Sequence, residues 1–361
     1  MDVTEAARVR ILVLEPYCGG SHQRFLAGLA AHLPFAFDLR GLPARGWKWR
    51  MRFSAPHYAA MLPQNREHDL VLCSTFVDVA TLRGLGPAWL GQIPVLTYFH
   101  ENQFAYPVQI EDERDMHFAV TNMMTAVASD RLAFNSAYNR ETFLAGCAAL
   151  CRRIPDMRLQ LAESLLEKSE VLYPPVDFRD LDRWGSEPGS RSRTPVIVWN
   201  HRWEHDKDPE AFFAALFTLA AEGVDFQLIL LGQSFVRQPE IFSRAIAQFD
   251  SRVLHAGFVR DHVDYCRLLS RSDIVVSTAR HEFYGIAVIE AVRAGCRPLL
   301  PNRLSYPELF PGEFLYDEGN LLPRLREALG QGRLGAERGR ELTRRFCWEE
   351  LAGRYQQWLT P

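Results

Sequence analysis

Short, continuous apolar runs, each followed by a polar loop, occur in both halves of the chain and limit the folds open to it. They cover residues 9–14, 69–74 and 93–99 in the first half, and residues 195–199 and 273–278 in the second. Runs of this length that do not alternate with polar residues are typical of strands buried on both faces of a parallel sheet. Because helices must cover both faces of such a sheet, the pattern predicts an α/β fold in each half.

The length of 361 residues is enough for two domains, each with a core of its own. Residues 178–194 are polar, mix Gly, Pro, Ser and Arg, and carry no apolar periodicity, so they form the expected linker. We therefore expect an N-terminal Rossmann-like domain at 1–177, a C-terminal one at 195–345 and an amphipathic C-terminal helix at 346–361.

Composition excludes several classes of protein. The net charge of −3 gives no overall basic field that would attract nucleic acid or a membrane. The seven cysteines are scattered and form no paired CxxC, which argues against a disulfide scaffold and a structural zinc site. Residues 1–8 are too polar for a signal peptide, and no apolar run approaches the length of a membrane span. We expect a cytoplasmic protein without stable membrane association.

Two glutamates flank the loop and helix that follow the apolar run at 273–278. Glu282 is expected in the loop and Glu290 inside a helix that ends at Gly295. Eight helical steps would bring the two carboxylates to roughly the same face, about 12 Å apart along the axis. The first turn offers unpaired N–H groups for a phosphate, at Gly285, Ile286 and Ala287. The arrangement suits a sugar nucleotide, although any α/β protein can carry two such glutamates and Glu290 could be a solvated surface residue.

Polar side chains also follow two strands of the first half, where ligands of an open α/β sheet bind. The strand at 9–14 leads into a glycine turn and a helix start, and the strand at 93–99 leads into a polar quartet. The candidate residues are Gly19, Gly20, Ser21 and His22 in the first loop, and His100, Glu101, Asn102 and Gln103 in the second. The alternatives are a tight turn in the first loop and a structural histidine in the second.

A basic and aromatic run lies between these loops, at residues 44–53. It alternates cations with two tryptophans, and its central residues are Trp47, Lys48, Trp49 and Arg50. An exposed strand or loop of this kind would offer phosphate partners and stacking surfaces to RNA. The alternative is an amphipathic strand with its tryptophans in the core.

The start of the second half carries a pair of cations, Arg202 and Lys207, between a strand and a helix. Cations in that place would neutralise a diphosphate leaving group, and the alternative is a charged surface loop. No convincing nucleophile and no Asp-x-Asp metal motif at a strand end is evident, so we expect no required metal and no tightly bound cofactor.

These motifs together resemble a GT-B glycosyltransferase of family 4, the retaining and metal-independent class. Its acid-x7-acid signature matches Glu282 to Glu290, and its cation clamp matches Arg202 and Lys207. A narrower resemblance is to the tRNA-queuosine α-mannosyltransferase family. It rests on Glu-Pro-Tyr-Cys-Gly-Gly-Ser-His at 15–22, Gly-Trp-Lys-Trp-Arg at 46–50, Tyr-Phe-His-Glu-Asn-Gln at 98–103 with Tyr-Pro at 106–107, and Glu-Arg-Asp at 113–115.

The resemblance implies two Rossmann-like domains whose parallel sheets face each other across a cleft, with the C-terminal helix packing back on the N-terminal domain. It implies transfer of mannose from GDP-mannose to the queuosine nucleoside of tRNA(Asp). Glu282 would contact the donor sugar, Glu290 the ribose, and His100 the region of the reacting sugar carbon. Arg202 and Lys207 would hold the diphosphate, together with backbone N–H groups of Tyr284 to Ala287 and the Gly19–Gly20 loop.

Two other functions remain open from the sequence. One is a family-4 transferase with another nucleotide-sugar donor and a lipid, polysaccharide or small-molecule acceptor. The other is a nucleotide-sugar or RNA-binding protein that has lost catalysis.

Overall fold

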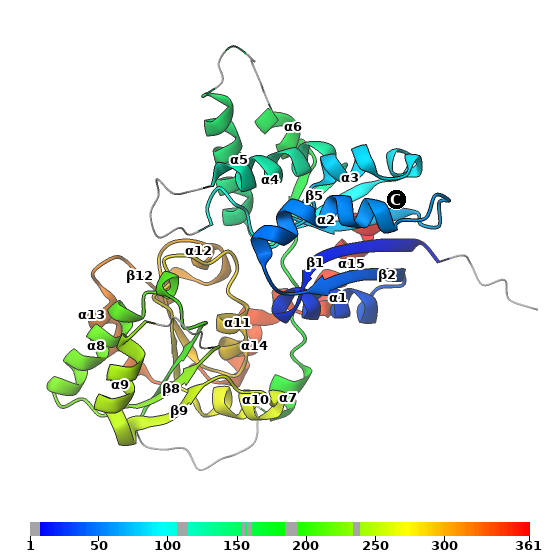
Figure 1. Ribbon diagram of the computed structural model, residues 1–361. Helices are drawn as coiled ribbons and strands as arrows, with labels where there is room; N and C mark the ends of the chain where they lie inside the picture. The colour runs from blue at the N-terminus through cyan, green and yellow to red at the C-terminus, as the bar shows by residue number, and fades with distance from the viewer. Residues whose placement is uncertain (1–7, 107–114, 154–155, 157–160, 185–193, 234–238) are drawn as a thin grey trace, which may run out of the picture. The chain divides into compact units, whose positions relative to one another are not determined.

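The computed structural model describes residues 8–106, 115–153, 156, 161–184, 194–233 and 239–361. The chain divides into two compact units (Figure 1). Unit 1 comprises Met1–Pro175 and Trp348–Pro361, and unit 2 comprises Val176–Cys347. Each unit contains one parallel six-stranded sheet with helices on both faces, which confirms the predicted α/β class.

In unit 1 the strand order is β2-β1-β3-β4-β5-β6. All five neighbouring pairs are parallel. The strands are β1 (Arg10–Cys18), β2 (Ala36–Pro43), β3 (Leu70–Ser74), β4 (Val95–Phe99), β5 (Arg131–Phe134) and β6 (Ser169–Val171). The helices are α1 (Gly20–His32), α2 (Trp47–Met61), α3 (Val79–Leu85), η1 (Ala88–Gly91), α4 (Met116–Ala128), α5 (Ala137–Cys151), α6 (Leu161–Glu167) and α15 (Trp348–Leu359).

Alternate residues of β1 face two different helical layers. Ile11 and Val13 pack with α1 and α15, whereas Leu12 and Leu14 pack with α2 and α3. All four side chains are buried, because successive side chains of a strand point to opposite faces of the sheet and both faces are covered.

The C-terminal helix belongs to unit 1. The indole of Trp348 stacks on His32 of α1 with ring centroids 4.7 Å apart, and Tyr355 donates hydrogen bonds to backbone oxygens that follow β6. Figure 1 shows α15, in red, beside α1. The last residues of the chain therefore complete the core of the first sheet.

In unit 2 the strand order is β12-β11-β10-β7-β8-β9, also parallel throughout. The strands are β7 (Val196–Asn200), β8 (Gln227–Leu231), β9 (Val253–Gly257), β10 (Ile274–Val276), β11 (Arg297–Pro301) and β12 (Leu315–Tyr316). The helices are α7 (Arg179–Trp184), η3 (His205–Lys207), α8 (Pro209–Ala221), α9 (Ile241–Phe249), η4 (Asp250–Arg252), α10 (His262–Arg271), α11 (Ile286–Arg293), α12 (Tyr306–Leu309), η5 (Gly312–Phe314), α13 (Leu321–Gln331), α14 (Ala336–Thr343) and η6 (Arg344–Phe346).

Both strand orders contain a point where the chain reverses direction across the sheet. In unit 2 this switch point lies between β7 and β10, and in unit 1 it lies between β1 and β3. Helices on either side of a switch point lie on opposite faces and leave a crevice at the carboxyl ends of the strands, where ligands bind. The sheet topology thus directs attention to the loops that follow β1, β3, β4, β7 and β10.

Two expectations differ from the structure. Residues 47–50 begin the 15-residue helix α2, and do not form a strand or loop. Alternation over so few residues does not determine secondary structure, and the buried face of α2, formed by Met51, Ala55 and Tyr58, follows the helical period. Within the expected linker, residues 179–184 form α7, which packs against α10 and α11 of unit 2, while residues 185–193 lie outside the described residues.

Pro107, Glu113 and Arg114, which contribute to two of the family motifs, also lie outside the described residues. Among the residues that the structure covers, no helix combines the length and the apolar character needed to cross a membrane.

Candidate active site

The strand, loop and helix predicted around the two glutamates are confirmed. β10 is followed by a loop and then by α11, whose N-cap Gly285 has φ 99° and ψ 44°. Gly295, with φ 97°, follows the helix end. The first turn of α11 holds no acidic residue, and no side chain in the described part of the chain caps it. Its leading N–H groups and the positive end of the helix dipole therefore suit an anion.

Lys207 and Glu282 meet at the switch point of unit 2. Lys207 is 5% exposed, and its Nζ donates a 2.5 Å hydrogen bond to the carbonyl oxygen of His281 and lies 3.4 Å from Oε2 of Glu282. Burial raises the pKa of Glu282, but Lys207 and, less strongly, His201 and His281 outweigh it, so the pKa lies below its ordinary value. Glu282 is therefore ionised at neutral pH.

A second carboxylate, which the sequence analysis missed, shares this lysine. Oδ2 of Asp206 lies 3.2 Å from Nζ of Lys207 and 3.7 Å from Nδ1 of His281. Burial raises the pKa of Asp206, but the interaction with His281 and the charge of Lys207 lower it more, so this carboxylate is also ionised. Asp206 follows β7 and His281 follows β10, so the adjacency of these two strands brings them together.

His201, also missed from the sequence, follows β7 directly and is 6% exposed. Burial and, second, the charge of Lys207 lower its pKa to about 4, so its ring is neutral. Its Nε2 is buried and has no hydrogen-bond partner among the described residues. A buried imidazole nitrogen without a partner is unfavourable by itself and fits a site that a polar ligand completes.

Arg202, the other expected cation, is placed differently from Lys207. Half of its side chain is exposed, and its guanidinium forms a 3.1 Å ion pair with Glu204. It is thus a surface cation in the loop after β7, whereas Lys207 is buried.

Glu290 is 5% exposed, which rules out the alternative of a solvated surface residue. The Tyr265 hydroxyl donates a 2.6 Å hydrogen bond to its Oε2. Asn200, at the end of β7, donates in turn to that hydroxyl and to the carbonyl of Ala287. The carboxylate is therefore held in one orientation by residues from β7 and α10.

The loop between the two glutamates is fixed by hydrogen bonds. The N–H of Tyr284 points to Oε1 of Glu282 at 3.4 Å, and Ser305 donates to the carbonyl of Tyr284. The N–H of Tyr284 is thus directed to the carboxylate of Glu282, whereas the turn at Gly285, Ile286 and Ala287 has no side-chain cap among the described residues.

In unit 1, Glu15, His22 and His100 converge from the ends of β1 and β4 and from α1. The carboxylate of Glu15 is 2% exposed and lies 3.0 Å from Nδ1 of His22. It also accepts hydrogen bonds from the N–H of Tyr17 and the hydroxyl of Ser74. The ring of His22 lies against that of His100, with centroids 4.1 Å apart.

The two histidines have opposite pKa shifts. Burial lowers the pKa of His22, but the carboxylates of Glu15 and Glu101 outweigh it and raise the pKa above its ordinary value. Burial and, second, the charge of His22 hold the pKa of His100 well below its ordinary value. An imidazole with a lowered pKa, that of His100, therefore lies beside one with a raised pKa, that of His22, at the carboxyl edge of the first sheet.

The same three residues are the one group of side chains in the described structure whose ligand atoms could hold a metal ion; those atoms lie within 4.8 Å of one another. However, Glu15 already accepts three hydrogen bonds, and the two rings lie against each other at a tilt of 31°. Metal coordination requires the nitrogen lone pairs to converge on one point, so this packing favours an acid–base cluster over a metal site.

The glycine turn before α1 is tightly constrained. A Cβ on Gly19 would lie 2.7 Å from Cβ of Ala44, and Gly20 has φ 54°. Ser21 is exposed at the helix start. Glycine is thus required here by packing at the first position and by backbone conformation at the second.

Of the expected polar quartet, Asn102 forms its hydrogen bonds within the protein. It is fully buried, and its amide nitrogen donates to the carbonyl and side-chain oxygen of Asn139 and to Thr142. Its side-chain oxygen accepts from the N–H groups of Phe104 and Ala105. Asn102 therefore shapes the loop after His100, while Glu101 and Gln103 bond to each other beside it.

The residues of the basic and aromatic run differ in how far they are packed against the rest of unit 1. Trp47 packs on Phe118 and Tyr106, and Arg50 reaches the carbonyl of Pro43. Trp49, in contrast, is 70% exposed.

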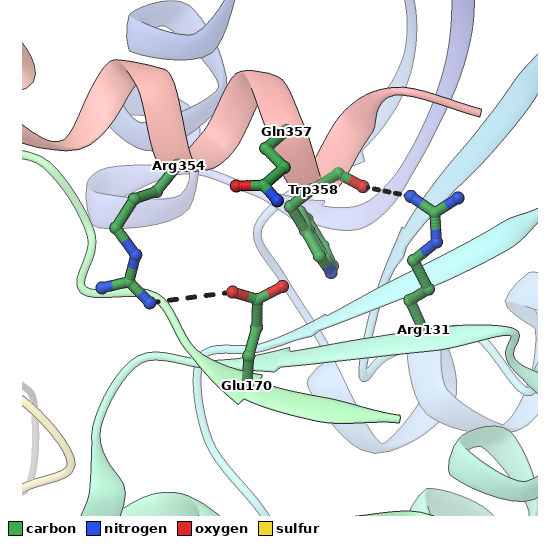
Figure 2. A pocket seen from close by; sticks show the side chains of 5 residues that line it. All are labelled: Arg131, Glu170, Arg354, Gln357 and Trp358. Atoms are coloured by element: carbon green, nitrogen blue, oxygen red, sulfur yellow. Dashed lines mark hydrogen bonds and ion pairs between the residues drawn. The ribbon is translucent and has the colours of Figure 1, made fainter. Parts of the chain in front are cut away.

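A pocket of about 270 Å³ in unit 1 lies away from these clusters (Figure 2). It is lined by Arg131, Glu170, Arg354, Gln357 and Trp358. Arg131 begins β5, so the pocket lies toward the amino ends of the strands, opposite the edge that carries His100. Arg131 donates to the carbonyl of Trp358, and Arg354 faces Glu170, so these residues hold α15 on the sheet.

Two protein families match successive parts of this chain. Residues 10–176 match the family described as tRNA-queuosine alpha-mannosyltransferase N-terminal, and residues 182–321 match glycosyl transferases group 1. The tRNA-queuosine alpha-mannosyltransferase of Drosophila melanogaster is 34% identical over 326 residues, which cover 88% of this chain and 86% of that protein.

Solved structures support the predicted GT-B fold. Sucrose-phosphate synthase from Thermosynechococcus elongatus aligns with a TM-score of 0.65 at 16% identity, over 97% of this chain and 98% of its own. The catalytic domain of starch synthase IV from Arabidopsis thaliana aligns with a TM-score of 0.70 at 13% identity, over 98% of this chain and 99% of its own. At these identities the likeness concerns the fold alone.

Proposed function

Since this chain belongs to the tRNA-queuosine alpha-mannosyltransferase family, we propose that it transfers mannose to the queuosine nucleoside of a tRNA, tRNA(Asp) in particular. GDP-mannose is the proposed donor, and the configuration at the sugar carbon is retained. The observation that carries the proposal is the cluster of Lys207, Glu282 and Glu290 around the open start of α11, at the switch point of unit 2.

The residues of unit 2 take the donor roles. The diphosphate is assigned to Lys207, Arg202 and the N–H groups at Gly285 to Ala287, because cations and a helix start neutralise phosphate. Glu282 is assigned to the hydroxyls of the donor sugar. Glu290, held by Tyr265, is assigned to the ribose.

The proposed reaction needs no protein nucleophile. The acceptor hydroxyl attacks the sugar carbon on the face from which the diphosphate departs, and negative charge grows on the leaving phosphate. A lysine that is already buried and ion-paired, together with oriented N–H groups, stabilises that charge without reorganising. Such preorganised groups typically contribute about 10²–10³ in rate each.

The residues of unit 1 take the acceptor and catalytic roles. Neutral His100 is assigned to the region of the reacting sugar carbon, with His22 against its ring. Gly19 and Gly20 are assigned to the donor phosphates. The proposed RNA contacts are Ser21, His22, Trp47, Lys48, Trp49, Arg50, Glu101 and Gln103.

We further propose that the enzyme works without a metal ion or a tightly bound cofactor, in the cytoplasm and without stable membrane association. Electrostatic help to the leaving group comes from Lys207 and the start of α11, which removes the need for a bridging cation. Activity should survive EDTA. Loss in EDTA that a divalent ion restores would contradict this part of the proposal.

The proposal is tested by incubating the protein with tRNA from queuosine-containing cells and either GDP-mannose or UDP-sugars, and by reading the nucleosides with mass spectrometry. A hexose on queuosine with GDP-mannose alone is the expected result. Release of GDP without a modified nucleoside would still support a glycosyltransferase but would contradict queuosine as its acceptor. A modified nucleoside formed with UDP-sugars would contradict GDP-mannose as the donor.

Variants separate the assigned roles in unit 2. Glu282→Gln should abolish transfer and leave GDP affinity largely intact, since its carboxylate is assigned to the sugar. Lys207→Met and Arg202→Gln should weaken GDP binding, measured by calorimetry. Arg326→Gln is the matched control, because Arg326 is a half-exposed arginine of the same unit that is also paired with a glutamate, Glu222. GDP affinity equal to that of the control would reject the cation clamp.

A further inference from the structure

We propose that the exposed face of α2 carrying Trp49 and Phe53 is a stacking platform for an unpaired base of the RNA substrate. The inference rests on the proposed function, because that function supplies the RNA. It goes further in assigning the contact to one helix face, in adding Phe53, and in separating Trp49 from its half-buried neighbour Trp47.

The platform consists of two aromatic side chains one helical turn apart. The ring centroids of Trp49 and Phe53 are 5.8 Å apart and their planes differ by 26°, which is a stacked arrangement. Trp49 is 70% exposed and Phe53 is 57% exposed. The two rings therefore stack on each other on the solvent side of the helix, and more than half of each side chain stays accessible to a further ring.

The opposite face of α2 is already packed. Met51, Ser54, Ala55 and Tyr58 are buried, Ser54 donates to the carbonyl of Phe76, and Tyr58 donates to the carbonyl of Arg40. The exposed rings are thus not needed to anchor the helix. Among the described residues, three phenylalanine and tryptophan side chains are exposed, namely Trp49, Phe53 and Phe258. Two of the three, Trp49 and Phe53, lie next to each other on α2.

Cations flank the rings on the same helix. Lys48 and Arg52 are both exposed and are also one turn apart, and the segment Trp47–Met61 contains no acidic residue. Lys48 lies 5.7 Å from the ring centroid of Trp47. Arg52 lies 4.7 Å from the centroid of Phe118 and pairs with Asp115 at 3.2 Å, which offsets part of its charge. The surface is therefore aromatic and cationic, which complements bases joined by phosphates.

This combination favours single-stranded RNA over a membrane. A helix that lies in a membrane interface presents a broad apolar face, whereas here the broad apolar face of α2 is buried in the protein and the outer face alternates rings with cations. Stacking of a base on an aromatic side chain contributes about 1–3 kcal/mol and requires an unpaired base, such as those of an RNA loop.

The test measures the dissociation constant of labelled queuosine-containing tRNA for full-length variants. Trp49→Ala should weaken binding about 5- to 150-fold, the ratio that corresponds to one lost stack. Trp49→Leu retains an apolar side chain but lacks a flat ring, so it should bind as weakly as Trp49→Ala. Trp49→Phe should stay close to the wild type, and Phe53→Ala should weaken binding.

The matched control is Leu85→Ala, which removes an exposed apolar side chain on α3 of the same unit. It should leave tRNA affinity unchanged, and thermal unfolding should show every variant folded. Wild-type affinity of Trp49→Ala and Phe53→Ala would overturn the platform. So would a loss of binding to anionic lipid vesicles with unchanged tRNA affinity, because it would assign the surface to a membrane.

Failure of the platform can be told from failure of the proposed function. If the wild type adds no hexose to queuosine, the proposed function fails, whatever the variants do. If the wild type is active, the platform predicts that Trp49→Ala loses tRNA affinity while GDP binding is unchanged, since no residue assigned to GDP lies on α2. Lower transfer by Trp49→Ala with unchanged tRNA affinity would contradict the stacking platform.

Discussion

At the scale of single residues, Lys207 shows how the site keeps a charge in a buried position. Removing an ammonium group from water is costly unless partners replace the lost hydration. Lys207 has three such partners, namely the carbonyl of His281 and the carboxylates of Asp206 and Glu282. Burial, the largest effect on both rings, and the charge of Lys207 lower the pKa values of His201 and His281, so two neutral imidazoles complete the cluster.

The carboxylate of Glu15 raises the pKa of His22, and this can be measured by NMR titration of the ring signals. In the wild type, His22 should titrate above its ordinary pKa and His100 should remain neutral well below it. Glu15→Gln should lower the pKa of His22, because burial then dominates. An unchanged pKa of His22 in this variant would contradict the assignment.

The pair formed by Glu15 and His22 makes the free energy of unfolding depend on pH. A histidine whose folded-state pKa is raised stabilises the protein fully below its unfolded pKa, about 6.5, and this stabilisation is lost as the pH rises through the folded-state pKa. The difference in free energy of unfolding between wild type and Glu15→Gln should therefore be larger at about pH 6 than at about pH 9. A difference independent of pH would show that His22 is not involved.

At the scale of elements, α11 depends on a backbone conformation that only glycine adopts easily. Gly285 has a positive φ, and a Cβ there would lie 3.3 Å from Cε1 of Tyr306. This geometry turns the chain from the Glu282 loop into the helix and leaves the first N–H groups without a side-chain cap in the described structure. The glycine therefore determines both the fold of the loop and the openness of the phosphate-binding turn.

Gly285→Ala should lower the free energy of unfolding by about 1–2 kcal/mol, the cost of a left-handed conformation for a residue with a Cβ, and should weaken GDP binding. The control is Gly319→Ala, where φ is 81° and a Cβ would meet nothing within 4 Å. It should show a similar loss of stability, measured by urea unfolding, with unchanged GDP affinity. Equal GDP affinity of both variants would show that the turn does not bind the donor.

At the scale of the whole molecule, the chain returns at its end to the unit where it began. Trp348, Leu351, Tyr355, Trp358 and Leu359 of α15 share one core with residues of β1, β3 and β4. Unit 1 therefore lacks one of its helices until residues 348–359 are made. Since such long-range contacts close only after the intervening unit has been synthesised, we expect unit 1 to complete its folding last.

Two glycines in helices of unit 1 should respond oppositely to alanine. Alanine normally stabilises a helix relative to glycine by about 0.4–1 kcal/mol. Gly84→Ala in α3 should do so, because a Cβ there meets nothing within 4 Å. Gly28→Ala in α1 should destabilise by about 1–3 kcal/mol, because its Cβ would overlap the indole of Trp348. The measurement is urea unfolding. Stabilisation by Gly28→Ala would mean that α15 does not pack tightly on α1.

The sequence by itself was sufficient for features that depend on local chemistry. Buried strands read as apolar runs, and Gly285 and Gly295 mark the ends of α11, because backbone conformation and the period of buried side chains are properties of neighbouring residues. Glu282, Glu290 and Lys207 are candidates from the sequence because each follows or lies within such a segment. Local patterning failed at residues 47–50, where the few alternating residues gave no reliable period and packing formed a helix.

Only the tertiary structure decided which loops meet. Asp206 joins His281, and Glu15 joins His22 and His100, because β7 lies beside β10 and β1 lies beside β3, with β4 next to it. The order of strands in a sheet depends on contacts between segments that are far apart in the chain, and no local period encodes it. The charge states of the histidines follow from the same contacts, because burial and neighbouring carboxylates determine them.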